Sequence, residues 1–166
     1  MLRQLSTILT VAAFFAAGCQ TQKTGTATQQ DTIPASTDTA RLQTRLSMPP
    51  AAASADSVML TFTVINPSNQ PQRFCKWETP FDRLGKYLDI QNAQGTEASF
   101  KGAMARRVMP PPAEAYITVP AHDSTTTTTN LARNYTLQPG AYTVKYVGGG
   151  VSGLNAGNEV RVAIGK

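Results

Sequence analysis

Two cysteines, one histidine and a run of three glycines are the residues whose types could support chemistry in this chain. A nucleophile formed by Cys75 and His122 would need a third group to orient the histidine, and a cysteine in the middle of a strand is poorly placed for attack. His122 beside Asp123 could begin a metal site, but a single histidine cannot supply the usual ligand set; a solvated turn histidine is the simpler interpretation. Gly148–Gly150 lacks the lysine and the helix of a phosphate-binding loop, which favours a flexible turn between the last two strands. The sequence therefore predicts no catalytic residue, no metal site and no cofactor.

The N-terminus carries the pattern of an export signal. Arg3 precedes an apolar run from Ile8 to Ala17, which is shorter than the roughly 20 residues that cross a membrane. The run ends in Ala-Ala-Gly-Cys19, which resembles a bacterial lipobox except that Ala16 replaces the usual larger aliphatic residue. The resemblance implies that residues 1–18 are a lipoprotein signal peptide and that Cys19 is lipidated. The alternative is an ordinary secretory signal followed by a chance cysteine.

The residues after the cysteine predict a tethered protein of the cell envelope. Gln20, rather than an aspartate, follows Cys19, and the lipobox resemblance then favours anchoring in the outer membrane. Residues 19–40 are dominated by Thr, Gln, Ala and Ser, so they cannot bury enough apolar surface to offset the entropy of ordering. We expect a flexible tether there and one domain over residues 41–166.

Lipidation of Cys19 would leave Cys75 without an intramolecular partner, so a structural disulfide is not expected. Cys75 is then either a buried small hydrophobe or a reactive thiol. In an alternating strand Cys75 and Trp77 share one face, while Phe74 and Lys76 share the other. This pattern predicts that Cys75 and Trp77 pack inward together, although Trp77 could also serve as a binding hot spot.

Apolar residues recur with a period of two from Arg41 onward, and no window has helical periodicity. Short strands separated by turns predict an all-β domain, an antiparallel β-sandwich of about seven to eight strands. The threonine run at residues 125–129 could be a low-complexity linker, but β-branched residues favour an exposed or edge strand. The strand candidates are residues 42–47, 58–65, 73–77, 87–90, 98–100, 116–119, 124–131, 142–146 and 159–164.

The charge argues against a nucleic-acid partner. The chain has 15 Lys and Arg residues against 10 Asp and Glu residues, for a net charge of +5. The basic residues are dispersed, and Arg106-Arg107 is the one adjacent pair. We therefore expect weak attraction to an anionic membrane and no nucleic-acid binding.

Several segments together resemble a known domain. They are Phe74–Phe81 (FCKWETPF), Phe100–Gly102 followed by Arg106-Arg107 and Pro110–Pro112, then Glu114–Ala121 and Gly140–Val144. In this order they are similar to the non-catalytic N-terminal domain of the deuterolysin-type (aspzincin) zinc metalloproteases, over roughly residues 42–146. The resemblance implies an immunoglobulin-like accessory or pro-domain. The proteases use His-Glu-x-x-His to hold zinc, which one histidine cannot supply.

The expected function is that of a non-enzymatic, lipid-anchored β-sandwich that binds a protein partner. The partner implied by the resemblance is a secreted metalloprotease, for which the domain would be an inhibitor, a folding aid or a docking module. A stiff proline segment loses little entropy on binding, so the candidate contacts are Arg106, Arg107, Met109, Pro110, Pro111 and Pro112. The same segment could instead be only a long crossover loop. The rivals are a structural outer-membrane lipoprotein without a defined soluble partner and an enzyme of unrecognised type.

Overall fold

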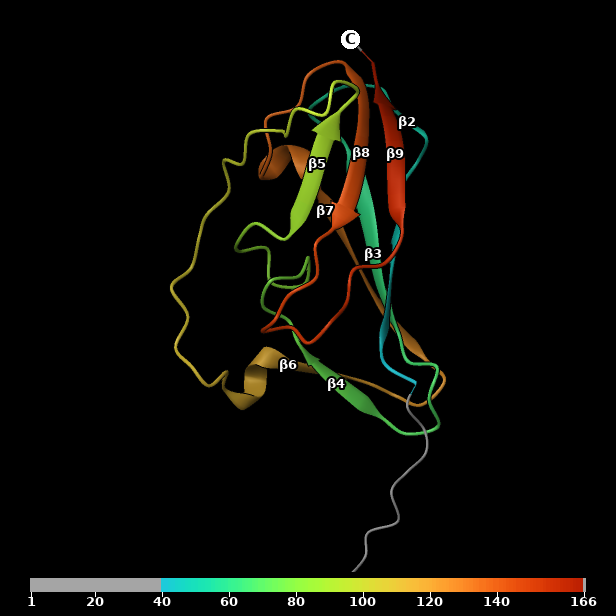
Figure 1. Ribbon diagram of the computed structural model, residues 1–166, viewed down its shortest axis with the longest axis vertical. Coiled ribbons are helices and arrows are strands. Elements are labelled where there is room, and N and C mark those ends of the chain that lie inside the picture. The colour runs from blue at the N-terminus through green and yellow to red at the C-terminus, as the bar shows by residue number, and fades with distance from the viewer. Residues whose placement is uncertain (1–39, 166) are drawn as a thin grey trace, which may run out of the picture. The chain divides into compact units, whose positions relative to one another are not determined.

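The computed structural model describes residues 40–165, over which nine strands and two short 3-10 helices follow one another (Figure 1). The predicted signal peptide, the lipidation site Cys19 and the predicted tether before Ala40 lie outside the described residues. The elements are β1 (Gln43–Ser47), β2 (Ala51–Ala52), β3 (Met59–Ile65), β4 (Gln72–Cys75), β5 (Leu88–Asn92), η1 (Ala113–Ala115), β6 (Tyr116–Val119), β7 (Ser124–Asn130), η2 (Leu131–Arg133), β8 (Gly140–Tyr146) and β9 (Glu159–Ile164).

The strands form two main sheets and one small ribbon. One sheet has three strands in the order β1-β3-β7, and the other has four in the order β2-β9-β8-β5. β4 and β6 pair separately, at the end of the domain away from the C-terminus (Figure 1). Every strand pairing is antiparallel except the two-residue pairing of β2 with β9, which is parallel.

The core lies between the two main sheets. Along β3 the side chains of Leu60, Phe62 and Val64 are fully buried, while those between them are half-buried. Val144 and Tyr146 of β8 belong to the same core. The rings of Phe62 and Tyr146 meet edge to face with centroids 4.9 Å apart. Burial of each large apolar side chain contributes about 1.5–3 kcal/mol to the stability of the fold. Each strand therefore turns the apolar face of its alternating sequence toward this core.

Buried tyrosines add fixed polar contacts to this core. The Tyr142 hydroxyl accepts a hydrogen bond from the Gln138 N–H at 3.1 Å, which ties the start of β8 to the preceding corner. A tyrosine that bonds back to the backbone at this corner is a hallmark of immunoglobulin-type sandwiches. The Tyr135 hydroxyl donates to the Leu88 carbonyl oxygen at 2.9 Å. Burial raises the pKa of Tyr135, and it also raises that of Tyr146, because the charged phenolate would lose its hydration.

The structure confirms the predicted all-β sandwich and corrects some of its elements. The segment predicted as a strand at residues 98–100 contains only one isolated bridge, which joins Phe100 to Tyr135. The third strand ends at Cys75 rather than at Trp77, because a turn begins there and Glu78 adopts a φ of 57°. β2 was not predicted, since two alanines carry no alternation, and its parallel pairing departs from the expected antiparallel sandwich.

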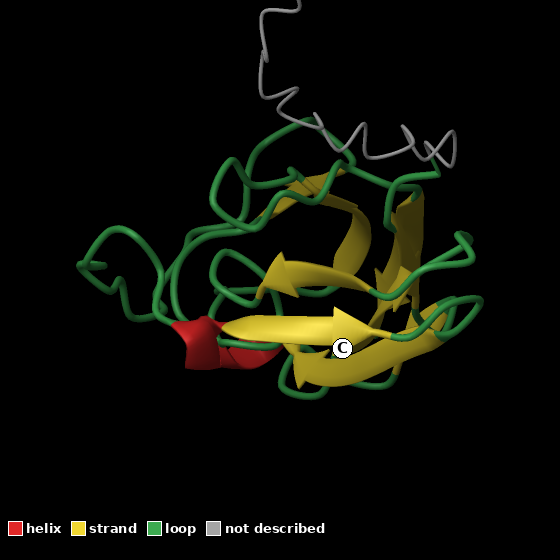
Figure 2. Cartoon of the chain, turned by 90° about the horizontal axis from the view of Figure 1, so that it is seen from below, coloured by secondary structure: helices red, strands yellow, loops and turns green. Residues whose placement is uncertain are grey.

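Over residues 40–165 helical structure is limited to two 3-10 turns of three residues each, although the sequence predicted none. Figure 2 shows the described chain as strands and loops with these short helical turns at one side. Within residues 40–165 no helix has the length and apolar character needed to cross a membrane.

Candidate protein-binding loop

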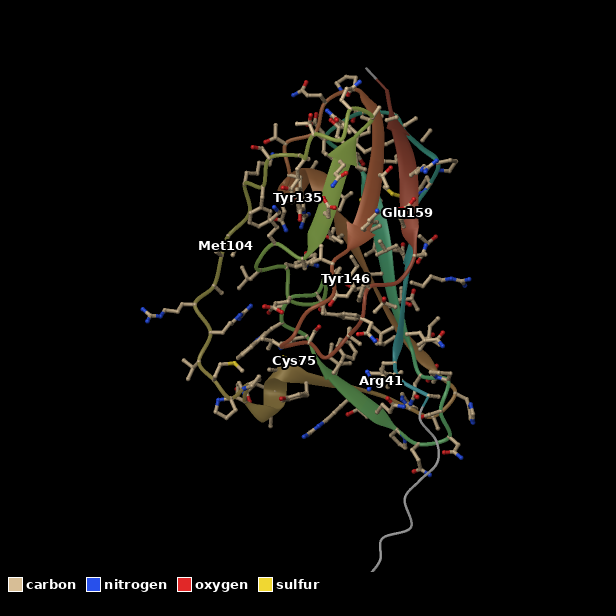
Figure 3. All side chains as sticks on the ribbon, in the orientation of Figure 1. Arg41, Cys75, Met104, Tyr135, Tyr146 and Glu159 are labelled. Carbon is tan, nitrogen blue, oxygen red and sulfur yellow. The ribbon has the colours of Figure 1, made fainter. Side chains whose placement is uncertain are left out.

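The candidate contacts lie on one long loop, residues 101–112, which we call the contact loop. It leaves the bridge at Phe100, arcs away from the strands and returns at η1 (Figure 1). Met104 lies on this outer arc (Figure 3). The loop therefore presents its side chains beside the sandwich rather than over a sheet.

Backbone hydrogen bonds hold both ends of the contact loop. The Lys101 N–H donates to the Asn134 carbonyl oxygen at 2.8 Å, and the Gly85 N–H donates to the Ala103 carbonyl oxygen at 2.9 Å. At the other end the loop enters η1, where the Lys76 N–H donates to the Ala115 carbonyl oxygen at 2.8 Å. With its ends fixed, the loop loses less conformational entropy on binding than a free segment would.

The structure separates the two adjacent arginines. Arg106 is exposed, whereas Arg107 turns back toward the domain and forms an ion pair with Asp82. The Arg107 guanidinium also lies over the Trp77 ring, 4.8 Å from its centroid. The Asp82 side chain is only 13% exposed, so this pair is better shielded from solvent than an ordinary surface ion pair. In this arrangement Arg107 anchors the middle of the contact loop, while Arg106 remains available for contact.

The loop that carries Asp82 has an unusual backbone conformation that local hydrogen bonds hold in place. Glu78 and Arg83 adopt φ values of 57° and 61°, which are unusual for residues other than glycine. The Thr79 hydroxyl donates to the Lys76 carbonyl oxygen at 2.5 Å, and the Asp82 N–H donates to the Thr79 carbonyl oxygen at 3.2 Å. These bonds place the Asp82 carboxylate where Arg107 reaches it. No local pattern predicts this partnership, because 25 positions separate the two residues in the sequence.

Apolar side chains gather on the outside of the contact loop. Met104, Val108 and Met109 are 72%, 81% and 61% exposed. Among the described residues only two other large hydrophobic side chains are exposed, Met59 and Val147. Exposed apolar side chains gathered on one segment are typical of binding surfaces. The sequence prediction included Met109 but not Met104 or Val108, which an apolar residue count over the loop would have found.

The prolines complete this apolar stretch. Pro110 and Pro112 are exposed and Pro111 is half-buried, and the Met109-Pro110 peptide bond is cis. Four of the six predicted contacts, Arg106, Met109, Pro110 and Pro112, are therefore exposed on the loop, whereas Pro111 and Arg107 are half-buried.

A small second core supports the inner side of this region. Cys75, Trp77 and Ala115 form a buried cluster, against which Tyr116 and Val151 pack. Cys75 is a free cysteine, 1% exposed, and its N–H donates to the Ser152 carbonyl oxygen at 3.2 Å. This confirms that Cys75 and Trp77 pack inward together. Phe74 does not point outward with Lys76, however, because it is 2% exposed and belongs to the main core.

The other residues considered for chemistry lie apart from this loop. His122 is exposed in the turn before β7, where it adopts a φ of 55° and its N–H donates to the Ser68 carbonyl oxygen. Gly149 accepts hydrogen bonds from the Gly153 N–H and the Ser152 hydroxyl, so the glycine turn is internally bonded. Over residues 40–165 no group of three or more His, Cys, Asp or Glu side chains is arranged to hold a metal ion.

The two facing sheets and the tyrosine corner define an immunoglobulin-like β-sandwich. A family model of the immunoglobulin-like domain matches residues 42–150, and the chain belongs to this family. No curated protein sequence matches it.

Among solved structures, a β-glucosidase from Listeria innocua is similar over a small part of its length. A mutant of that enzyme in complex with laminaribiose matches with 13% identity and a TM-score of 0.41. A second structure of the enzyme matches with 14% identity and a TM-score of 0.38. Each match covers 76% of this chain and 16% of the glucosidase chain.

Proposed function

We infer that this immunoglobulin-like domain is a non-enzymatic binding module that docks on another protein through the contact loop. The observation that carries this inference is the exposure of Met104, Val108 and Met109 on a loop whose ends and middle are fixed. Apolar side chains on a preorganised loop can be desolvated by a partner at a small entropic cost. Arg106 would lie at the rim of such an interface and favour an acidic edge on the partner.

The partner proposed is a secreted metalloprotease of the deuterolysin type. The support is the resemblance of this chain to the accessory domain of those enzymes, which includes the segments around Trp77 and Arg107. These two residues are far apart in the sequence but in contact in the fold. The domain would then act on the protease as an inhibitor, a folding aid or a docking module.

The proposal also includes a lipid anchor on Cys19 that holds the domain at the outer membrane. A Cys19→Ser variant would not be acylated, so the protein should leave the detergent phase or stay uncleaved. A variant that remains membrane-bound with a normally cut signal would overturn this part of the proposal.

The docking test measures the affinity of the purified chain for a deuterolysin-type protease secreted by the same organism. A triple variant with Met104, Val108 and Met109 changed to serine should bind at least about tenfold more weakly, since truncated hot-spot contacts cost about 2 kcal/mol or more. The matched control changes Met59 and Val147 to serine, which removes exposed apolar side chains elsewhere, and should bind as the parent does. Absence of binding by the parent chain would overturn the proposed partner.

The same preparation tests the non-enzymatic part of the proposal. Its casein hydrolysis and zinc content should both be at background, because one histidine cannot form the three-ligand site of a zinc protease. Proteolysis that a chelator abolishes would contradict it.

A further inference from the structure

β7 forms the outer edge of the three-stranded sheet, and its free side is unpaired. All seven of its residues pair with β3, from Ser124 opposite Ile65 to Asn130 opposite Met59. In the described part of the chain, the backbone groups of residues 125–129 have no hydrogen-bond partner outside β3. Alternate backbone groups of an antiparallel strand point to each side, so a row of N–H and C=O groups lies open along β7.

The outer edges of β1 and β5 are closed by other segments. On β1, the Asn158 side chain bonds both the N–H and the carbonyl oxygen of Leu46, at 2.8 and 3.0 Å. On β5, the Ala98 N–H donates to the Ile90 carbonyl oxygen at 2.8 Å. β7 has no comparable cover within residues 40–165, so its outer edge is available along residues 125–129.

β7 also lacks the features that usually prevent edge-to-edge pairing. Such edges normally carry charged side chains, prolines or bulges. The sequence of β7 is Ser-Thr-Thr-Thr-Thr-Thr-Asn, without a charge or a proline, and its pairing with β3 continues without interruption. The nearest charged residues are Asp123 just before the strand and Arg133 just after it.

The threonines of β7 form hydroxyl contacts with β3, and a further strand on the other side of β7 could form contacts of the same kind. The Thr126 hydroxyl is 3.1 Å from that of Thr63, and the Thr128 hydroxyl is 3.5 Å from that of Thr61. Cross-strand pairs of threonines stabilise antiparallel sheets through these hydroxyl contacts. A second threonine strand could form the same contacts on the free side.

We propose that β7 pairs antiparallel with β7 of a second copy of this chain, centred on Thr127. In this register Thr126 of each copy lies opposite Thr128 of the other, and two three-stranded sheets become one sheet of six. A two-fold interface requires a surface that complements itself. The sequence of this strand is nearly the same when it is read in either direction, so two antiparallel copies place threonine opposite threonine. The Asp123 end of one copy would also lie beside the Arg133 end of the other, so the flanking charges are complementary.

The test follows the oligomeric state of the full chain in a non-ionic detergent by sedimentation velocity, between about 1 and 100 µM, the range for a small interface. The parent chain should form a concentration-dependent dimer. T126K/T128K should weaken this dimer at least about tenfold, because each lysine meets a lysine of the other copy. T126E/T128E should weaken it similarly, and a mixture of the two variants should recover a dimer with one copy of each.

The matched control is Q43K/S47K, which adds the same two charges to exposed positions on β1 of the same sheet. It should dimerise as the parent does. Circular dichroism and thermal melting check that each variant is folded, and the glutamate pair provides a second disruption if the lysine pair does not fold. A monomeric parent chain over the whole range overturns the proposal, as does a dimer that the folded lysine and glutamate variants leave unchanged.

Discussion

The two outer strands of the three-stranded sheet differ in what lies along their outer edges. β1 is covered by residues 155–158, whose polar groups bond to Thr44 and Leu46. β7 is flanked by no such segment among the described residues and carries only hydroxyl and amide side chains. The same sheet therefore has one edge that contributes to the stability of the domain and one that remains available for association.

Closure of the β1 edge depends on a glycine. A Cβ atom at Gly157 would lie 2.1 Å from the Thr44 carbonyl oxygen, far inside van der Waals contact. Only glycine lets the chain approach β1 this closely. The contrast between the edges predicts that substitutions of Gly157 and Asn158 lower stability, whereas substitutions on β7 change association.

The largest expected effect is that of Gly157→Ala. Its methyl group meets backbone rather than a flexible side chain, so the covering segment must move away from β1. Overpacking of this kind costs about 1–3 kcal/mol, and we expect the upper end in the free energy of unfolding measured with urea. The matched control is Gly150→Ala, where an added Cβ has no heavy atom within 4 Å. Equal stability of the two variants would contradict the role given to Gly157.

A smaller loss is expected for Asn158→Ala. The variant leaves the N–H and the carbonyl oxygen of Leu46 without their partner in a part-buried position. An unsatisfied buried polar group costs about 1–3 kcal/mol, so the free energy of unfolding should fall by about 2 kcal/mol. Asn155→Ala is the control, because Asn155 contributes its backbone carbonyl and not its side chain to the contact with Thr44. A large loss in the control would show that the segment acts in some other way.

The sequence predicted the strands well where burial alternates. The segments proposed for β6 and β9 have the observed bounds, and the threonine run is an edge strand rather than a linker. Alternating residue types indicated β9, whereas the strand preference of β-branched threonine indicated β7. The prediction failed at residues 98–100 and at β2, because pairing there depends on distant strands rather than on local periodicity.

The contact loop could be predicted only in part for the same reason. Prolines and adjacent charges indicated a loop, so its place in the chain was correct. The partnership of Arg107 with Asp82 and Trp77 depends on how two loops meet in the fold. No local signal distinguishes Arg107 from Arg106, and neither the open edge of β7 nor the cover of β1 can be deduced without knowing the strand order.

The contrast between a bonded and a free group also applies to the two arginines. Arg107→Ala removes the ion pair with Asp82 and the contact with Trp77, and should lower the free energy of unfolding by about 1 kcal/mol. Arg106→Ala should change it by less than about 0.5 kcal/mol but weaken partner binding at low salt. Denaturant unfolding and binding measured on both variants separate the two roles. Equal stability losses would mean that Arg107 does not anchor the loop.

The smallest expected effect concerns the charged face of the four-stranded sheet, which contrasts with the uncharged β7. Glu159 lies 3.0 Å from the Lys145 ammonium and 3.6 Å from Arg161. The hydrogen bond from Lys145, followed by its charge, holds the pKa of Glu159 below its ordinary value of 4.5. A lowered pKa means that this carboxylate stabilises the fold above the ordinary pKa and that its contribution disappears as the pH falls through the lowered value.

Lys145→Gln should therefore raise the pKa of Glu159 toward its ordinary value of 4.5. The NMR chemical shift of the Glu159 carboxyl carbon, measured against pH, follows this change. Arg161→Gln should raise it less, because Arg161 is farther away and contributes less to the shift. Both changes should shrink at high salt, since exposed charges are screened, and a larger shift for Arg161→Gln would contradict the assignment of Lys145 as the main partner.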